Sequence, residues 1–237
     1  MTSAEVMAFL VSRRRVLIIG GAAIILHGLH RGTKDTDIWM DPLPDIESWL
    51  SPIAELTKEH GISLQCIGDL SGEFRPIDVA DVPSMIEADR MIRIVSNDRP
   101  IDVFYRATNL GLGDFDGAWE RGRQLEEGAR VIDAIDLIVT KYQTGRDHDQ
   151  SDIAFLQSKI EKVYEQRLKT CYPEEANELF ERFLLPESAA FAAKHAENDA
   201  VRKLGLEVLA RLSADGDPFA IELQEQLRQE LRSGDDA

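Results

Sequence analysis

Apolar residues in the first half of the chain alternate between short β-branched runs and longer segments with helical spacing. The run Val16–Ile19 ends on two glycines, which is typical of a buried strand that enters a tight turn. Further short apolar runs predict the strands Asp35–Met40, Ile62–Ile67, Met91–Ser96 and Pro100–Tyr105. The last two should form an antiparallel hairpin about Asn97-Asp98-Arg99. Apolar residues spaced three or four positions apart predict the helices Ala4–Arg13, Ala22–His27, Asp45–His60 and Asp114–Arg121.

The second half of the chain has a different pattern. From Val131 onward no run is typical of a strand, and helical spacing predicts helices near 133–144, 149–169, 174–184, 187–195, 197–213 and 217–232. With 237 residues, of which 43% are hydrophobic, the chain can bury a core of ordinary size. We therefore expect an α/β (α+β) core with a mixed β-sheet flanked by helices, followed by an all-helical C-terminal region. The core is assigned to residues 1–125 and the helical region to residues 126–237.

Five residues in the first half suggest chemistry. Gly20 and Gly21 lie where the first strand turns into a helix, and glycines there let backbone N–H groups approach a phosphate. Asp35 and Asp37 are separated by one residue, so that on a strand both side chains lie on one face. Asp102 is a single charge within an apolar strand, and a buried carboxylate needs a partner. The simplest common partner is a cation held by all three acids.

The nature of that cation follows from its ligands. Two carboxylates held close together repel each other unless a cation lies between them. Oxygen ligands on a rigid strand suit Mg²⁺, which usually keeps some water and shares phosphate oxygens with a substrate. The pattern therefore favours a magnesium site that also holds a triphosphate, although each carboxylate alone could equally lie on a solvated strand face.

This pattern resembles the DNA polymerase β-like nucleotidyltransferase superfamily. That family has Gly-Gly or Gly-Ser, a spacer, Asp-x-Asp or Asp-x-Glu, and a later acid on a strand, here Gly20-Gly21, Asp35, Asp37 and Asp102. Thr36, between the first two acids, departs from the family because it is polar where an apolar residue is usual.

A narrower resemblance is to toxin nucleotidyltransferases of the AbiEii and MenA type and their relatives. It is carried by His27-Gly28-x-x-Arg31-x-Thr33-x-Asp35. Arg31 could contact the nucleotide or fix the loop that carries Asp35.

A second signature of these toxins is a lysine on a helix followed by Gly-Arg and spaced acids. Here it reads Lys141-x-x-x-Gly145-Arg146-x-x-Asp149-x-x-Asp152. Lys141 would lie near a helix end and reach the β- and γ-phosphates, and Gly145 would stop that helix. Alternatively, Arg146 and the two acids form a structural ion-pair corner between two helices.

The resemblance implies an enzyme that transfers a nucleoside monophosphate from an NTP to an acceptor hydroxyl. Two Mg²⁺ ions would be held by Asp35, Asp37 and Asp102, with Asp102 as a possible base. The nucleotide would be bound by Gly20, Gly21, Arg31, Thr33, Lys141 and Arg146. The acceptor would be the 3′ end of a tRNA, the product would be toxic to the host cell, and an antitoxin protein would be the partner. Three alternatives stay open: an aminoglycoside-like acceptor, a protein hydroxyl, and a regulatory module that binds nucleotide without turnover.

Charge limits the choice of partner. The 43 acidic residues outnumber the 27 Lys and Arg and give a net charge of −16, with both parts of the chain acidic. No broad basic surface for coating a duplex is therefore expected. Arg13-Arg14-Arg15, Arg31 and Lys34 are local positive charges that could hold one nucleic-acid end. A cationic small substrate would suit the acidic chain equally well, and the acidity could also serve only solubility.

The remaining features concern location and assembly. Cys66 and Cys171 are far apart and belong to no metal-type cluster, so we expect reduced core thiols in a cytoplasmic protein. The N-terminal segment lacks the signal-peptide pattern, and no segment approaches the length of a membrane span. The stripe Leu204, Leu206, Leu209 and Leu212 could mediate a dimer or pack in a core, which leaves the oligomeric state open.

Overall fold

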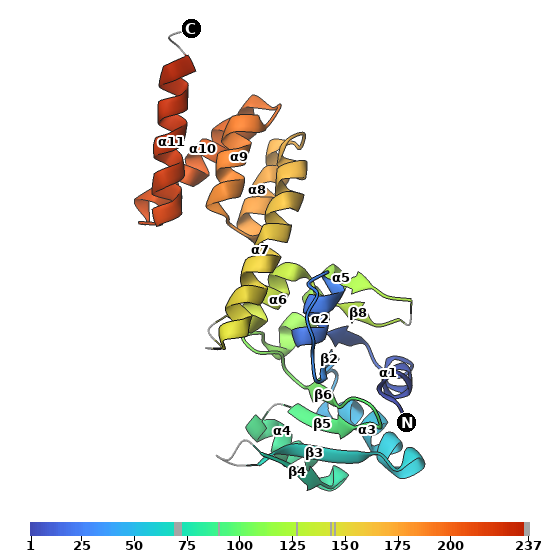
Figure 1. Ribbon diagram of the computed structural model, residues 1–237. Helices are drawn as coiled ribbons and strands as arrows, with labels where there is room; N and C mark the ends of the chain where they lie inside the picture. The colour runs from blue at the N-terminus through green and yellow to red at the C-terminus, as the bar shows by residue number, and fades with distance from the viewer. Residues whose placement is uncertain (69–72, 90, 127, 143, 145, 235–237) are drawn as a thin grey trace. The chain divides into compact units, whose positions relative to one another are not determined.

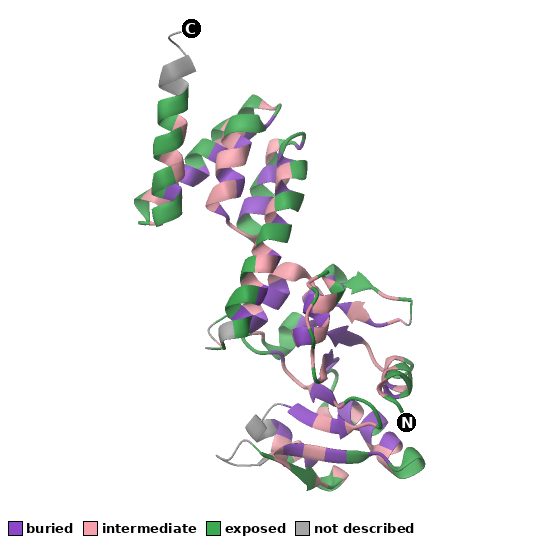
Figure 2. Cartoon of the chain, viewed as in Figure 1, coloured by how far each residue is buried: buried purple, intermediate pink, exposed green. Residues whose placement is uncertain are grey.

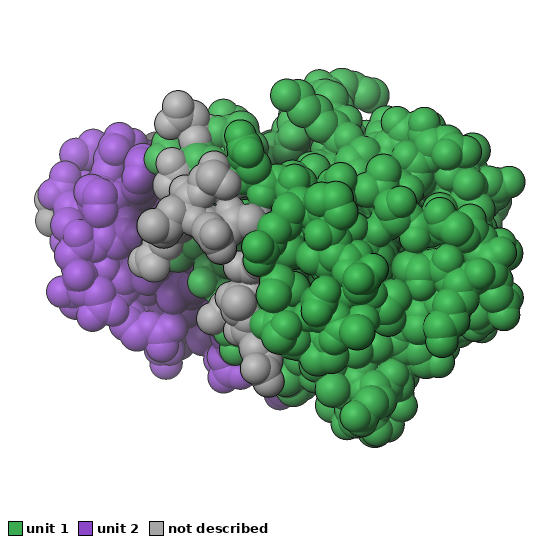
Figure 3. Space-filling model, turned by 90° about the horizontal axis from the view of Figure 1, so that it is seen from below, with its two compact units in different colours: residues 1–156 green, residues 157–237 purple. Residues whose placement is uncertain are grey.

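A computed structural model of the chain describes residues 1–68, 73–89, 91–126, 128–142, 144 and 146–234. The chain divides into two compact units, Met1–Leu156 and Gln157–Ala237, which are coloured separately in Figure 3. The division lies within the helix α7 (Asp147–Leu168). The boundary expected after residue 125 therefore lies inside unit 1, and the assignment of catalysis to residues 1–125 alone stays a prediction.

Unit 1 is built on a mixed eight-stranded sheet, in the order β4-β3-β5-β6-β2-β1-β8-β7. The pairs β1–β8 and β2–β6 are parallel, and all other neighbours are antiparallel. The strands are β1 (Val16–Ile18), β2 (Thr36–Met40), β3 (Ser63–Gly68), β4 (Glu73–Ile77), β5 (Met91–Val95), β6 (Ile101–Phe104), β7 (Arg123–Gln124) and β8 (Arg130–Val131). The adjacent strands β5, β6 and β2 carry the charged residues described in the next subsection.

The helices of unit 1 are α1 (Ser3–Val11), α2 (Gly20–Leu26), α3 (Ile46–His60), α4 (Val82–Asp89), α5 (Phe115–Arg121), α6 (Ala134–Lys141) and the first part of α7, with 3₁₀ turns at Val79–Asp81 and Leu112–Asp114 (Figure 1). Of these, α2 packs against β2, and α4 packs against β3 and β5. Local sequence explains several of the helix ends. Thr2 and Glu5 form a capping box at the start of α1, and the Asp45 side chain caps α3. Gly61 ends α3 in the left-handed conformation with φ 63°.

The core of unit 1 centres on β1, β2 and β6, whose residues are mostly buried (Figure 2). Trp39 of β2 packs edge-on against Phe115 of α5, with ring centroids 5.0 Å apart. The Trp49 indole of α3 donates a hydrogen bond to the Met40 carbonyl at 3.3 Å. These two contacts hold β2 against α5 and α3. Asp37 lies on β2, and Asp35 immediately precedes it.

Within unit 2, the described residues form helices only. After the second part of α7 come α8 (Pro173–Arg182), α9 (Pro186–His195), α10 (Asp199–Ala214) and α11 (Pro218–Gly234). Gly205 allows α10 to approach α9 closely, because a Cβ at this position would lie 2.7 Å from the backbone of Ala189 and Ala193. Leu209 is fully buried and Leu206 is 42% exposed, so the leucine stripe contributes partly to the core.

The predicted fold class is confirmed: a mixed sheet flanked by helices precedes a helical region. Sequence reasoning missed β4, α4, β7 and β8, and the expectation of no strand from Val131 onward is wrong by one residue. Cys66 and Cys171 are buried and unpaired, as expected of core thiols. Among the described helices, none has the length and apolar character needed to span a membrane.

Candidate active site

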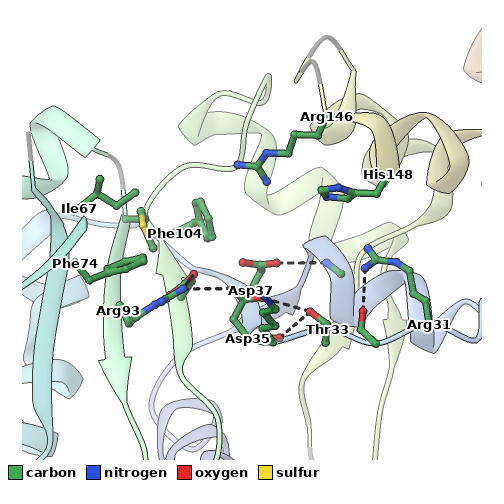
Figure 4. A pocket seen from close by; sticks show the side chains of 15 residues that line it. Arg31, Thr33, Asp35, Asp37, Ile67, Phe74, Arg93, Phe104, Arg146 and His148 are labelled. Atoms are coloured by element: carbon green, nitrogen blue, oxygen red, sulfur yellow. Dashed lines mark hydrogen bonds and ion pairs between the residues drawn. The ribbon is translucent and has the colours of Figure 1, made fainter. Parts of the chain in front are cut away.

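Three carboxylates meet at the middle of the unit 1 sheet. Asp37 lies on β2 opposite Asp102 on the parallel strand β6, and Asp35 immediately precedes β2. One oxygen from each carboxylate lies within 4.8 Å of the other two (Figure 4). The strand register therefore brings together acids that are 65 residues apart in the sequence (102 − 37).

The cluster is electrostatically costly without a cation. Burial, together with the charges of Asp35 and Asp102, raises the pKa of Asp37 to about 6. Burial also raises the pKa of Asp102, against the opposing effect of Arg93. A divalent cation would relieve this repulsion, and oxygen-only donors are the ligands that Mg²⁺ prefers. By donor chemistry the cluster fits such an ion.

Gly20 and Gly21, at the turn from β1 into α2, lie in close contact with the Asp37 side chain. Gly20 has a φ of +56°, and a Cβ there would lie 1.9 Å from the Asp37 Oδ2. The Gly21 N–H donates to the same oxygen at 3.3 Å. A Cβ at Gly21 would lie 2.8 Å from the Thr33 Oγ1. The Thr33 hydroxyl lies 3.1 Å from the Asp35 carbonyl oxygen and 3.3 Å from the Asp35 Oδ1, so Gly21 contacts the carboxylate of Asp37 and Thr33 contacts that of Asp35.

Arg93, which sequence reasoning missed, is the cation nearest to the cluster. Its Nε and Nη2 donate to the two oxygens of Asp102 at 2.6 and 2.7 Å, and Nη2 also reaches the Asp35 Oδ2 at 3.3 Å. The guanidinium lies over the Phe74 ring, 3.6 Å from its centroid. The hairpin itself was predicted, but centring it on Asp98 pairs Arg93 with Val103, whereas the observed register is shifted by one residue and pairs Arg93 with Asp102.

A second ion-pair network joins α6, α7 and the loop that carries Arg31. The Lys141 Nζ pairs with Asp149 at 2.5 Å and with Asp152 at 2.8 Å, and the Arg31 Nη2 pairs with Asp152 at 2.8 Å. The Lys141 side chain is only 7% exposed. Burial acts to raise the pKa of Asp149, but hydrogen bonds from Lys141 and Thr144 lower it.

This network corresponds to the structural corner considered from the sequence, but with different cations. Lys141 and Arg31 supply its positive charge, while the exposed Arg146 side chain points toward the pocket (Figure 4). Lys141 nevertheless acts on the cluster, since its charge lowers the pKa of Asp37. The helix stop expected at Gly145 lies outside the described residues, and α6 ends at Lys141.

The carboxylates open into a cavity of about 750 Å³ with two different walls (Figure 4). One wall carries the polar and cationic residues Arg31, Thr33, Lys34, Arg146 and His148. The other carries Ile67, Phe74, Met91 and Phe104 around Arg93. An adjoining cavity of about 160 Å³ is lined by Gly20 and Lys141 and shares Asp37 with the first. All nine residues predicted from the sequence line one of these two cavities, whereas the apolar wall and His148 were not predicted.

Comparisons with known proteins add little to this geometry. No protein-family model matches the chain, and no curated protein matches it significantly. Among solved structures, it is similar to a crystal structure described as a "putative nucleotidyltransferase from H. pylori". The identity is 14% and the TM-score 0.38, over 95% of each chain. A likeness of this size establishes no shared activity, so the function has to be inferred from the site.

Proposed function

We propose that unit 1 is a metal-dependent nucleotidyltransferase. It would transfer a nucleoside monophosphate from an NTP to an acceptor hydroxyl and release pyrophosphate. The observation that carries this proposal is the Asp35, Asp37 and Asp102 cluster, whose oxygens lie within 4.8 Å of one another beside the Gly20-Gly21 turn.

The three carboxylates would hold two Mg²⁺ ions. When bound, such ions stabilise the attacking and leaving oxygens of an in-line displacement. The acceptor oxygen forms a bond to the α-phosphorus as the bond from that phosphorus to the bridging oxygen of pyrophosphate breaks. We assign the proton of the acceptor hydroxyl to Asp102, which is buried and has a raised pKa.

The two walls of the cavity suggest how the substrates lie. Arg31, Lys34 and Arg146 line one wall, and we place the triphosphate there. In an in-line displacement the nucleophile approaches opposite the leaving group, so the acceptor would enter from the side of Phe74 and Phe104. The Lys141 ammonium group is already paired with Asp149 and Asp152. Lys141 would therefore be a positioning residue, which acts through these two acids rather than by touching the phosphates.

The character of the second wall favours one class of acceptor. Phe74 and Phe104 offer flat apolar faces that suit a nucleobase, and base–aromatic stacking is typically worth about 1–3 kcal/mol. A polycationic aminoglycoside would instead meet the guanidinium of Arg93. Together with the toxin-like sequence signatures, this supports a tRNA 3′ end as acceptor. An antitoxin partner and a cytoplasmic location are proposed from the sequence alone.

The first experiment is a transfer assay. The protein is incubated with Mg²⁺, each α-labelled NTP in turn and total cellular RNA, beside an Asp35→Asn variant as control. The proposal predicts label in RNA of tRNA size that is absent in the variant and in EDTA. Equal labelling by the variant would contradict the assigned site. Label only in protein or in an added aminoglycoside would indicate the same reaction with a different acceptor. Thermal stabilisation by Mg²⁺ and NTP without any product would indicate a binding module.

A further inference from the structure

We propose that Arg93 is the internal counter-cation of the carboxylate cluster and determines how many metal ions it binds before the nucleotide arrives. This inference rests on the proposed metal site. According to this inference, the nucleotide-free cluster binds one divalent ion tightly, and a second ion binds stably only together with the triphosphate.

The contacts of Arg93 support this assignment. It spans two of the three acids, with both oxygens of Asp102 at 2.6 and 2.7 Å and the Asp35 Oδ2 at 3.3 Å. Bidentate pairs of this kind are among the strongest charge-assisted hydrogen bonds. A guanidinium group stays protonated in proteins, so Arg93 is a permanent positive charge beside the two acids.

The side chain is also held in place from outside the cluster. Its strand β5 is paired with β6 so that Arg93 lies opposite Asp102. The Phe74 ring covers the guanidinium at 3.6 Å, and the Arg93 side chain is 17% exposed. This environment makes Arg93 a fixed charge of the site rather than a surface arginine that pairs transiently.

Charge counting then gives the expected number of ions. The three carboxylates carry −3 when ionised, and Arg93 reduces this charge to −2, which one divalent ion neutralises. A second ion would leave an excess of +2, which the triphosphate offsets. The neighbouring network of Arg31, Lys141, Asp149 and Asp152 is neutral by itself and does not change the count. Lys34, Arg146 and His148, on the opposite wall, are exposed and screened by solvent.

The test is a titration of the full chain with Mn²⁺, in which the free ion is measured by electron paramagnetic resonance. Four proteins are compared: wild type, Arg93→Gln, Arg93→Lys and Arg99→Gln. Arg99 is a matched control because it is an exposed arginine in the turn of the same hairpin. Each protein is titrated with and without a non-hydrolysable NTP analogue, and each is melted in EDTA and in Mn²⁺.

We expect one tightly bound Mn²⁺ in wild type and a second only with the analogue. Arg93→Gln should bind its first ion at least about tenfold more tightly and take up a second without nucleotide, since a charge only a few ångströms away is removed. Its melting temperature should fall in EDTA and rise more than that of wild type on adding Mn²⁺. Arg93→Lys, which keeps the charge, should bind like wild type, as should Arg99→Gln.

Three results would overturn the inference. Equal affinity and stoichiometry in wild type and Arg93→Gln would show that Arg93 does not limit metal uptake, and the proposed transfer would be unaffected. Failure of Mn²⁺ to stabilise a poorly folded Arg93→Gln would give Arg93 a purely structural role. No Mn²⁺ binding by any of the proteins, with or without the analogue, would remove the proposed metal site itself.

Discussion

At Gly20 the backbone has a φ of +56°, and the Asp37 carboxylate occupies the space that a side chain would fill. A left-handed conformation is cheap for glycine and strained for other residues. Here the conformational requirement and the position of a functional carboxylate coincide at one residue. Gly20 thus affects the site mainly through Asp37.

Gly20→Ala should displace Asp37 as well as strain the turn. We expect a loss of about 1–3 kcal/mol in the free energy of unfolding, with nucleotide transfer reduced at least about a hundredfold if a shift of about 1 Å misplaces the reacting groups. Urea unfolding and the transfer assay measure the two effects. Gly113→Ala is the matched control, since a Cβ there meets nothing within 4 Å. Full transfer activity in Gly20→Ala would show that the turn does not position the site.

Asp37→Asn should stabilise the metal-free protein. The pKa of Asp37 is raised from 3.8 to about 6, so its contribution to stability is full below pH 3.8 and is lost as the pH rises through 6. The amide avoids that cost, and we expect a gain on the order of 2 kcal/mol in EDTA above pH 6, which vanishes below about pH 4. Denaturant unfolding at several pH values measures it. A variant less stable than wild type throughout would contradict a destabilising charge cluster.

At this scale the sequence predicted the three acids and the glycines, because their residue types and spacing are unusual in themselves. It did not predict that Lys141 is held by Asp149 and Asp152, because pairing between side chains depends on distances that the sequence does not contain. Arg93 lies between these cases. Its strand and hairpin were predicted, but the predicted centre at Asp98 is half a residue from the observed one, so the sequence did not predict the pairing of Arg93 with Asp102.

At the scale of elements, the corner between α6 and α7 supports the loop that leads into β2. Asp152, with a side chain that is 1% exposed, pairs with both Lys141 and Arg31. One carboxylate therefore fixes a helix end, a helix start and the loop before Asp35. The corner is a structural support of the candidate site.

Asp152→Asn should be strongly destabilising, in contrast with Asp37→Asn. Breaking a buried ion pair by removing one partner leaves uncompensated charges and typically costs about 3–5 kcal/mol. The free energies of unfolding of the two variants, measured with denaturant under the same conditions, distinguish a supporting acid such as Asp152 from an acid of the candidate site such as Asp37. If Asp152→Asn were as stable as wild type and Asp37→Asn were destabilised, the two roles would have to be exchanged.

The strands that the sequence missed share a physical reason. The strands β7 and β8 contain two residues each, and β8 exists because it pairs with β1. β4 has no buried residue and contains Pro76, so it lacks the apolar alternation that marks a strand. Such segments take their structure from tertiary partners, whereas α3, with its cap at Asp45 and its stop at Gly61, is specified locally and was predicted almost to the residue.

At the scale of the whole molecule, the candidate site lies in one unit, whereas acidic residues are spread over the whole chain. All nine predicted site residues belong to unit 1 and line its two cavities. The chain carries a net charge of −16, and Arg31, Lys34 and Arg146 are the cations on the wall assigned to phosphates. If these cations hold the triphosphate, the acceptor would be held mainly by the aromatic wall of Phe74 and Phe104, and few charges remain to bind RNA phosphates.

The salt dependence of RNA modification should therefore be shallow. Because the three cations of this wall are assigned to the triphosphate and not to RNA phosphates, the logarithm of the apparent affinity for RNA should fall with the logarithm of the salt concentration with a slope no steeper than about −1. Measuring KM for RNA from low to physiological salt gives this slope. A slope of about −6 would require a basic surface outside the cavity and would contradict this placement of the acceptor.

The most direct test of the account is crystallographic. Crystals of the full chain are soaked with Mn²⁺ and a non-hydrolysable NTP, and the ions are located from their anomalous signal. The account predicts ions coordinated by Asp35, Asp37 and Asp102, with the triphosphate along the wall of Arg31 and Arg146. Ions elsewhere, or a nucleotide bound away from these carboxylates, would contradict the proposed nucleotidyltransferase site.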